Sequence, residues 1–274
     1  MMMKDETWDA FHQRLAVLMN EIHGICIANN IRYTMLGGTL IGAVRHRGFI
    51  PWDDDIDIGI PYPDYKRFIE VAFSMSHEWI EFDLAGVTDG YYCPFIKAYD
   101  KRTTFLESNR DADKPKGIFI DIFPIVKAGN DGKEAIREFR KHRLYQSLLK
   151  RKGYHFNTGA IRERVLSFIA CFYSVDSLMR KIHRHYDLLD RTDGKLSSDM
   201  DGAPRGIVPT ELFGSFILYP FEQYMFYGIE RADDYLHLVF GDYMRMPPEE
   251  ERRPHHIEYI NLELPYSKFL VKHE

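Results

Sequence analysis

Four aspartates within five positions are the residues of this chain most able to do chemistry. They are Asp53, Asp54, Asp55 and Asp57. Carboxylates this close repel one another, and a divalent cation such as Mg²⁺ or Mn²⁺ would relieve that repulsion. In an extended segment Asp55 and Asp57 share one face, about 6 to 7 Å apart, whereas Asp54 points away from them. This spacing suits carboxylates that hold one or two metal ions for phosphoryl transfer.

A solvated acidic turn is the alternative explanation of such a run. The hydrophobic alternation favours the metal site, because Ile56 and Ile58 interleave with the acids as in a strand with one face in a core. An EF-hand loop is excluded, since the ligand spacing, central glycine and closing glutamate are missing. Asp53 follows a turn at Pro51, so we assign it a supporting role beside the substrate.

A glycine turn precedes the acidic run. The apolar residues 33–36 lead into Gly37-Gly38-Thr39, and residues 40–44 are apolar at helical spacing. This pattern predicts a strand, a tight turn and a helix start. The backbone N–H groups of the turn and the Thr39 hydroxyl would then hold the phosphates of a donor. A purely structural turn is the alternative, and the acidic run nearby favours the phosphate cradle.

Three polar residues follow this turn closely enough to contact donor phosphates. Arginine suits paired phosphate oxygens, so we favour Arg45 and Arg47 for this role. His46 remains a candidate for substrate contact or for a general base.

The run from Gly37 to Ile58 resembles the signature of the LicD-family phosphotransferases, relatives of fukutin within the nucleotidyltransferase-fold superfamily. That superfamily adds a third carboxylate from a neighbouring strand, and Asp121, between two isoleucines, matches it best. The resemblance continues at residues 219–222, 235–236, 240–244, 247–248 and 255–256. Phe240 stands where tyrosine is expected, and residues 130–206 match nothing that we can name.

The resemblance implies metal-dependent transfer of a phospho-alcohol, foremost phosphocholine from CDP-choline, with release of CMP. The acceptor would be a hydroxyl of a bacterial surface glycan, free or lipid-linked, such as lipopolysaccharide, teichoic acid or capsule. Asp55, Asp57 and Asp121 would hold Mg²⁺ or Mn²⁺, or Asp121 would accept the hydroxyl proton. The alternatives are phosphoglycerol or phosphoribitol transfer, nucleotidyl transfer from a nucleoside triphosphate, and an inactive glycan-assembly partner.

Other residues are candidates for ligand contact. Lys97, in an expected strand, could reach a donor phosphate, and an exposed surface charge is the alternative. Glu222 matches the family pattern and is expected to contact substrate. A choline group needs aromatic faces, for which Trp52, Tyr92 and Tyr99 are candidates.

The periodicity predicts an α+β fold in which a small mixed sheet, nucleotidyltransferase-like by the resemblance, is flanked by helices. We expect helices at residues 8–25 and 65–73, and strands at 79–84, 91–99, 118–123 and 216–219. The division expected is a catalytic core at residues 1–130, a basic helical insertion at 131–206, and a C-terminal segment at 207–274 that completes the core and substrate site. Within the insertion, residues 133–152 and 160–191 are expected to be helical.

Composition agrees with an ordinary soluble enzyme, because 45% of the 274 residues are hydrophobic and 28% are charged. The net charge of −5 gives no reason to expect nucleic acid. Three widely spaced cysteines and the absence of a signal peptide favour the cytoplasm. Ordinary solvated helix faces are the commoner explanation of the charges in the basic middle segment. The alternative is that this amphipathic segment makes peripheral contact with the inner face of the membrane.

Overall fold

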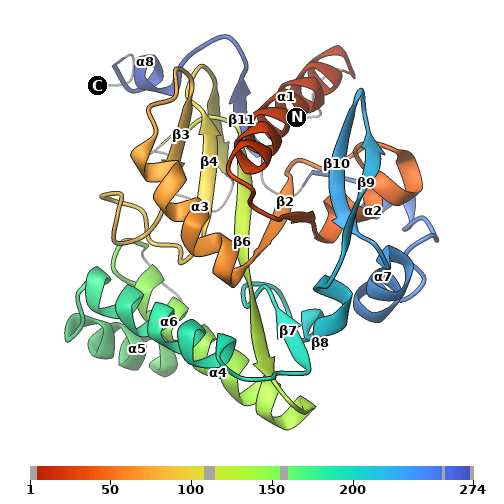
Figure 1. Cartoon of the computed structure of the whole chain (residues 1–274). Helices are drawn as coiled ribbons and strands as arrows, with labels where there is room; N and C mark the ends of the chain where they lie inside the picture. The colour runs from red at the N-terminus through yellow and green to blue at the C-terminus, as the bar shows by residue number, and fades with distance from the viewer. Residues whose placement is uncertain (1–4, 108–114, 155–159, 255–256, 272–274) are drawn as a thin grey trace.

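The computed structural model describes residues 5–107, 115–154, 160–254 and 257–271. Within these residues a nine-stranded mixed sheet forms the centre, with helices around it (Figure 1). Its strands are β1 Thr34–Met35, β2 Asp57–Pro61, β3 Ile80–Asp83, β4 Ile96–Asp100, β6 Phe119–Gly129, β7 Leu196–Ser198, β8 Val208–Pro209, β9 Phe216–Phe221 and β10 Tyr224–Ile229. The α-helices are α1 Asp5–Ala28, α2 Gly37–His46, α3 Tyr62–Ser74, α4 Gly132–Lys150, α5 Ile161–Cys171, α6 Val175–Asp190, α7 Ala232–Phe240 and α8 Tyr266–Val271.

The strand order of the sheet is β3-β4-β6-β2-β1-β10-β9, and β7 extends it by pairing with β6 and β8. Strands β2 and β6 are parallel, as are β1 and β10, whereas the other pairs are antiparallel. A separate two-stranded sheet joins β5 Thr104–Glu107 to β11 Ile257–Asn261. The predicted α+β class with a mixed sheet is therefore confirmed.

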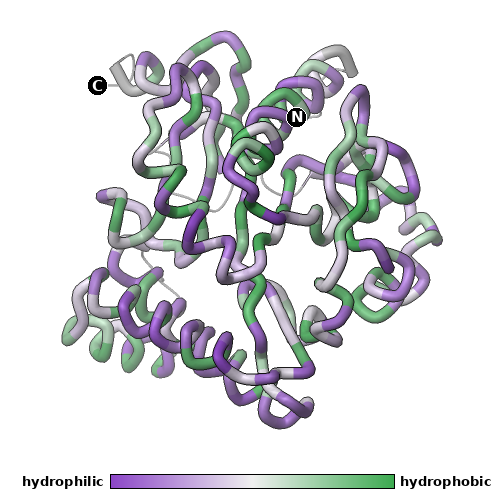
Figure 2. The backbone as a smooth tube through the Cα atoms, in the orientation of Figure 1, coloured by the Kyte–Doolittle hydropathy of each residue, from purple (hydrophilic) through white to green (hydrophobic). Residues whose placement is uncertain are grey.

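Apolar side chains of α1 and of the central strands make the core. Phe11, Leu15 and Leu18 are almost fully buried, as their spacing predicts, and α1 begins and ends close to the expected residues. Ile58 and Ile60 are also fully buried on β2. Figure 2 shows hydrophobic residues along the central strands and mixed colours along the flanking helices.

Two element predictions are wrong in part. The strand expected at 91–99 begins only at Ile96, because residues 91–95 form an irregular segment with a bend at Pro94 and Phe95. The helical segment expected at 160–191 is two helices. Ser174 starts the second one, since its hydroxyl accepts a hydrogen bond from the Ser177 N–H.

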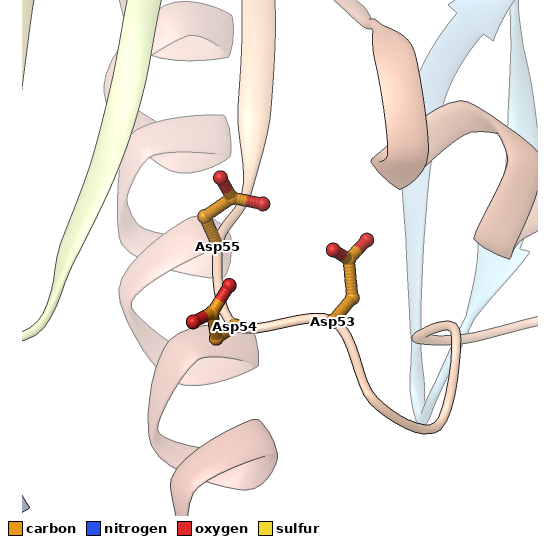
Figure 3. Close-up of side chains that lie close together, drawn as sticks. All are labelled: Asp53, Asp54 and Asp55. Carbon is orange, nitrogen blue, oxygen red and sulfur yellow. The ribbon is translucent and has the colours of Figure 1, made fainter. Parts of the chain in front are cut away.

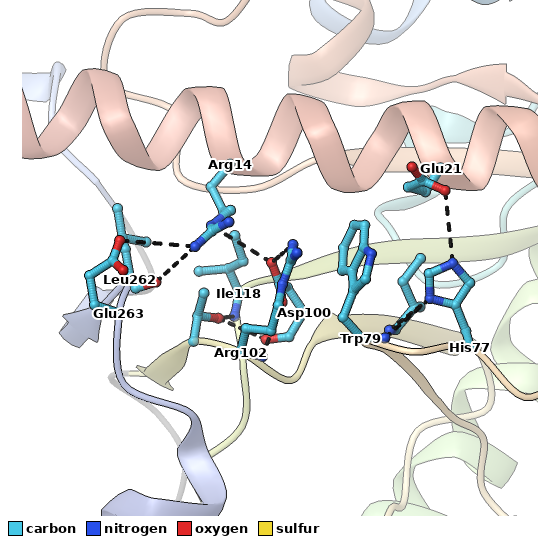
Figure 4. Close-up of polar contacts among 11 residues, drawn as sticks. Arg14, Glu21, His77, Trp79, Asp100, Arg102, Ile118, Leu262 and Glu263 are labelled. Carbon is cyan, nitrogen blue, oxygen red and sulfur yellow. Dashed lines mark hydrogen bonds and ion pairs between the residues drawn. The ribbon is translucent and has the colours of Figure 1, made fainter.

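Polar contacts hold α1 to the end of β4 and to the C-terminal segment (Figure 4). The Arg14 guanidinium donates to the Leu262 carbonyl over 3.1 Å and lies 3.8 Å from the Asp100 carboxylate. Asp100 is fully buried and also binds Arg102, whose guanidinium lies over the ring of Trp79 at 3.8 Å. This network ties α1 to the end of β4 and to the C-terminal segment.

Helices α4, α5 and α6 gather beyond one end of the sheet, at the bottom of Figure 1. The side chain of Asp131 caps α4 by accepting from the N–H groups of Lys133 and Glu134. Among the helices that the structure describes, none is both long and apolar enough to cross a bilayer. The three-part division of the chain stays a prediction, although β7, within residues 131–206, joins the central sheet through β6.

Candidate active site

The glycine turn lies against the acidic run. Gly37 starts α2 with a φ of 51°, a left-handed conformation that favours glycine. A Cβ atom on Gly38 would lie 2.6 Å from Oδ2 of Asp53, and one on Gly37 would lie 3.4 Å from Oδ2 of Asp57. The two glycines therefore let the N-terminus of α2 approach the carboxylates, which agrees with the predicted strand, turn and helix start.

The aspartates approach one another more closely than a regular strand would allow. Each of Asp53, Asp54 and Asp55 offers a carboxylate oxygen, and these oxygens lie within 4.8 Å of one another (Figure 3). The expectation that Asp54 points away is therefore wrong. Its physical cause is that β2 begins only at Asp57, so the alternation of a strand does not apply to residues 53–56. Asp54 is 2% exposed, whereas Asp53 and Asp55 are half-buried.

Strand register places Asp121 beside Asp57, as the resemblance implied. The two residues are direct partners on the parallel strands β2 and β6, and Lys97 is the partner of Asp121 on β4. Because Ile56, Ile58 and Ile60 point into the core, Asp57 emerges on the opposite face of the sheet. The ammonium of Lys97 and the carboxylates of Asp121 and Asp57 are thus neighbours on the adjacent strands β4, β6 and β2.

Lys97 is buried, so the exposed-charge alternative is wrong. Its side chain is 2% exposed, and its Nζ atom lies 3.0 Å from Oε1 of Glu107 and 3.3 Å from Oδ1 of Asp121. The ring of Phe119 lies 3.3 Å from the same atom. A cation with two carboxylate partners and an aromatic face is held firmly, and one of those partners belongs to the acidic site.

Burial and neighbouring charge disfavour the ionised form of Asp57. Burial raises the pKa of Asp57 well above its ordinary value, and the carboxylates of Asp55, Asp121, Asp53 and Asp199 raise it further. The site therefore concentrates oxygen ligands and negative charge, which is the environment that hard divalent cations such as Mg²⁺ prefer. The oxygens of Asp53, Asp54 and Asp55, within 4.8 Å of one another, fit such an ion, and Asp57 adds its charge beside them.

Asp199 is a member of this cluster that sequence reasoning missed. It follows β7, and its Oδ1 atom accepts hydrogen bonds from the N–H groups of Asp201 and Gly202 over 3.1 and 3.2 Å. Burial raises the pKa of Asp199 also. The one available signal was the Asp-Met-Asp-Gly sequence at 199–202, in the part of the chain that resembled nothing named.

Tyr235, on α7, closes the glycine side of the site. Burial, then the charges of Asp199 and Asp57, raise the pKa of Tyr235. Its phenol lies beside the backbone of Gly37, which works against the rise of its pKa. The sequence had placed Tyr235 in the C-terminal resemblance without a role, and the structure brings it to the turn.

Thr39 and Arg45 lie near the acids in ways the sequence did not predict. The Thr39 hydroxyl oxygen accepts the Asp57 N–H over 2.9 Å, so it fixes the start of β2. Arg45 donates to the Tyr243 carbonyl and, through Nε, to Nε2 of His46 over 2.9 Å. Burial lowers the pKa of Arg45 and the charge of Asp53 opposes that effect, which places this guanidinium near the acidic run.

Arg47 and Glu222 lie at the opposite end of α2. Arg47 is exposed, and its carbonyl accepts the Glu222 N–H over 2.9 Å. Glu222 occupies the two-residue turn between β9 and β10 with a φ of 53°, and its carboxylate accepts the Phe49 N–H over 3.1 Å. Glu222 therefore braces the loop after α2, and its contact with substrate stays a prediction, as does phosphate binding by Arg47.

The aromatic candidates differ in exposure. Tyr99 is 1% exposed and packs against Phe119, so burial excludes it from an aromatic box in this arrangement. Trp52 and Tyr92 are half-buried. Both stay candidates for a cationic alcohol, whereas the pair His255-His256 lies outside the described residues.

Comparison with known proteins agrees with this arrangement. The family model described as "LicD/FKTN/FKRP, nucleotidyltransferase domain" matches residues 30–160, which include the glycine turn, the acidic run, β6 and α4. The chain is 31% identical over 250 residues to the lipopolysaccharide cholinephosphotransferase LicD of Haemophilus influenzae, which covers 88% of this chain and 92% of that protein. It is also 49% identical over 41 residues to the human ribitol 5-phosphate transferase FKRP, covering 15% of this chain and 8% of that protein.

The family model and the similarity to a cholinephosphotransferase over most of both chains show that this protein is a phosphotransferase. The chain belongs to the LicD family. The resemblance seen in its sequence is thereby confirmed, and the inactive-partner alternative is disfavoured.

Proposed function

We propose that this enzyme transfers phosphocholine from CDP-choline to a hydroxyl of a bacterial surface glycan, with CMP as the leaving group. The observation that carries the proposal is the alignment of Asp57 with Asp121 on adjacent strands, with Asp55 and the glycine turn beside them. The relative that spans most of both chains is named a lipopolysaccharide cholinephosphotransferase, which supports the choice of alcohol and of acceptor.

Asp55, Asp57 and Asp121 would hold Mg²⁺ or Mn²⁺. When bound, the ion would neutralise charge on the diphosphate of the donor. We assign Asp199 to the same cluster, because its negative charge raises the pKa of Asp57, as burial does. The chemistry of these side chains, all oxygen donors, suits a hard cation.

The N-terminus of α2 would bind the donor phosphates. The N–H groups of Gly37, Gly38 and Thr39, in the first turn of α2, are the ones we assign to phosphate. Arg45, held near Asp53, would add positive charge on the same side. Lys97 is bound to Asp121 and Glu107, so it orients Asp121 rather than reaching the donor.

The location proposed is the cytoplasm, in peripheral contact with the inner face of the membrane. Cys26, Cys93 and Cys171 are all free thiols, which agrees with a reducing compartment. Nucleotide-activated donors and a lipid-linked acceptor would meet the enzyme there.

The test is CMP release from CDP-choline, CDP-glycerol and CDP-ribitol, with Mg²⁺ or Mn²⁺, and with lipopolysaccharide, teichoic acid or capsular polysaccharide as acceptor. Wild type is compared with Asp55→Ala and Asp57→Ala, and with Asp89→Ala as an exposed control. We expect metal-dependent CMP release from CDP-choline that is lost in both site variants and kept in the control.

Two other results would change the proposal. Release of CMP from CDP-ribitol or CDP-glycerol alone would keep the reaction and replace the alcohol; the short match to a ribitol 5-phosphate transferase is the reason to include that donor. Pyrophosphate from a nucleoside triphosphate, without CMP from any donor, would assign the site to nucleotidyl transfer.

A further inference from the structure

Helix α5 presents an apolar face that the rest of the described molecule leaves uncovered. Leu166 and Ala170 turn inward and are buried. On the opposite side, the apolar side chains and their exposed fractions are Ile161 80%, Val165 51%, Phe168 66% and Phe172 72%. These four positions are spaced by four, three and four residues, so they form one stripe along the helix.

The two phenylalanines make the centre of this stripe. Their rings meet edge to face with centroids 5.1 Å apart. Both rings are more than half exposed, although they contact each other. Most of their apolar surface therefore remains in water, which is unfavourable. Such a pair is stabilised by any apolar phase that covers it.

Positive charge borders the stripe on both sides. Arg162 and Arg164 are exposed, and at 100° per residue they lie on either side of the apolar residues. The one carboxylate within Ile161–Cys171, Glu163, is half-buried and paired with Arg151 of the α4 end. At the α5–α6 link, Lys181 lies over the ring of Tyr173 at 5.5 Å. The outward face of α5 therefore combines apolar side chains with cations and carries no carboxylate of its own.

We propose that α5 is a membrane-contact helix that inserts its apolar stripe into an anionic lipid surface. An apolar stripe flanked by arginines is the pattern that binds in the interface plane, where rings enter the acyl boundary and guanidinium groups meet lipid phosphates. A second copy of the chain is the less suitable occupant, because a symmetric contact between two such faces would bring cations against cations. The idea of a lipid-linked acceptor rests on the proposed function. The binding of α5 to lipid is argued from the helix itself and does not depend on that function.

The experiment is co-sedimentation of the full chain with vesicles of phosphatidylcholine, either alone or with about 30% phosphatidylglycerol. We expect binding to the anionic vesicles, and weak binding to the neutral ones. Phe168→Ser/Phe172→Ser should bind about tenfold more weakly. Arg162→Gln/Arg164→Gln should lose about fivefold in affinity for each arginine on anionic vesicles only.

A matched control replaces two exposed apolar side chains elsewhere. Leu218 and Met225, on the β9–β10 hairpin, are 45% and 47% exposed. Leu218→Ser/Met225→Ser should bind vesicles as wild type does. A fluorescent variant, Phe168→Trp, should show a blue-shifted emission and quenching by brominated lipid when anionic vesicles are added.

Three outcomes would overturn the proposal. The first is wild type that does not sediment with anionic vesicles, and the second is equal binding by the phenylalanine variant. The third is a concentration-dependent dimer that the phenylalanine substitutions abolish, which would make the stripe an interface between copies. CMP release with a soluble acceptor, measured on the same variants, separates this result from the proposed function: it should be unchanged in all α5 variants and lost in Asp57→Ala, which should still bind vesicles.

Discussion

The position of Asp57, buried among other carboxylates, serves the proposed reaction but opposes folding. It is held by a hydrogen bond from its own N–H to Thr39, and its carboxylate faces other carboxylates. A group whose folded pKa is raised binds more protons in the folded chain than in the unfolded one. Its contribution to stability therefore falls as the pH rises from the ordinary aspartate pKa through the raised value, and at neutral pH its ionisation opposes folding.

Asp57→Asn should accordingly stabilise the metal-free protein while abolishing its activity. We expect the free energy of unfolding at neutral pH, without divalent cations, to rise by about 1 kcal/mol. CMP release should fall about 1,000-fold. Urea unfolding in EDTA and a CMP assay measure the two effects. Asp89→Asn, at an exposed position, should change neither, and a destabilised Asp57→Asn would show that the carboxylate is not under repulsion.

Lys97→Met should destabilise the protein by about 3 kcal/mol, because it leaves two carboxylates without their shared ammonium. Adding Glu107→Gln to Lys97→Met should recover part of that loss. Chemical denaturation of the single and double variants measures the coupling. If the double variant is no more stable than Lys97→Met, the ion pair is not what the lysine supplies.

Residue-scale prediction from the sequence succeeded for side chains whose partners are nearby and failed where the partners come from other strands. The closeness of the acids to the glycine turn could be predicted from the sequence, because a short segment joins them. The burial of Lys97 was not, since Glu107 and Asp121, which compensate its charge, lie on β5 and β6. Asp199 reaches the site only because β7 pairs with β6 at Ser198 and Val126.

At the scale of elements, the packing of α4 against α6 contains a buried neutral histidine. His142, on α4, is 1% exposed, and its Nδ1 atom shares a hydrogen bond of 2.9 Å with the Tyr186 hydroxyl of α6. Burial, aided by the charges of His185, Arg143 and Lys150, lowers the pKa of His142 to about 3. The unfolded chain therefore takes up this proton at a higher pH than the folded one.

Stability supplied by neutral His142 is present above the ordinary histidine pKa and is lost as the pH falls from about 6.5 toward 3. Between pH 7 and pH 5 this histidine should remove about 2 kcal/mol from the free energy of unfolding. His142→Gln should lack that part of the pH slope. Urea titrations of wild type and His142→Gln at both pH values test it. An unchanged slope in His142→Gln would contradict the assignment.

Prediction of the elements followed the strength of their periodicity. Helices α1 and α3 carry apolar stripes over several turns, and both were found close to their true bounds. The break between α5 and α6 depends on one capping hydrogen bond at Ser174, which composition alone does not reveal. Residues 91–95 are apolar enough for a strand, but they form an irregular segment with a bend, because tertiary contacts override β-propensity.

At the scale of the whole molecule, a bound metal should stabilise the fold. The acidic cluster joins residues from β2, β6 and the segment after β7, so an ion that binds there would link three parts of the sheet. We expect Mg²⁺ at about 100 times its Kd to add about 2.7 kcal/mol to the free energy of unfolding. The gain should grow with pH, because protons compete with the metal at a site whose pKa is raised. Thermal unfolding with Mg²⁺ or EDTA at pH 6 and 8 measures it.

The same titration in Asp55→Ala/Asp57→Ala is the control, and this variant should show no Mg²⁺-dependent shift. Equal shifts in wild type and variant would place the metal elsewhere. No shift in wild type would remove the metal from the proposed mechanism while leaving the family of the protein unchanged.

The two-residue strand β1 pairs with β10, with Met35 opposite Gly228, and it leads directly into the glycine turn. The first half of the chain thus carries most of the reactive residues, but the strand that presents the turn is completed by a hairpin synthesised much later. Contacts between such distant segments form slowly, after local helices and hairpins are in place. We expect a nascent or partly folded chain to contain its acids and its glycines without aligning them, so that the enzyme becomes active only at the last step of its assembly.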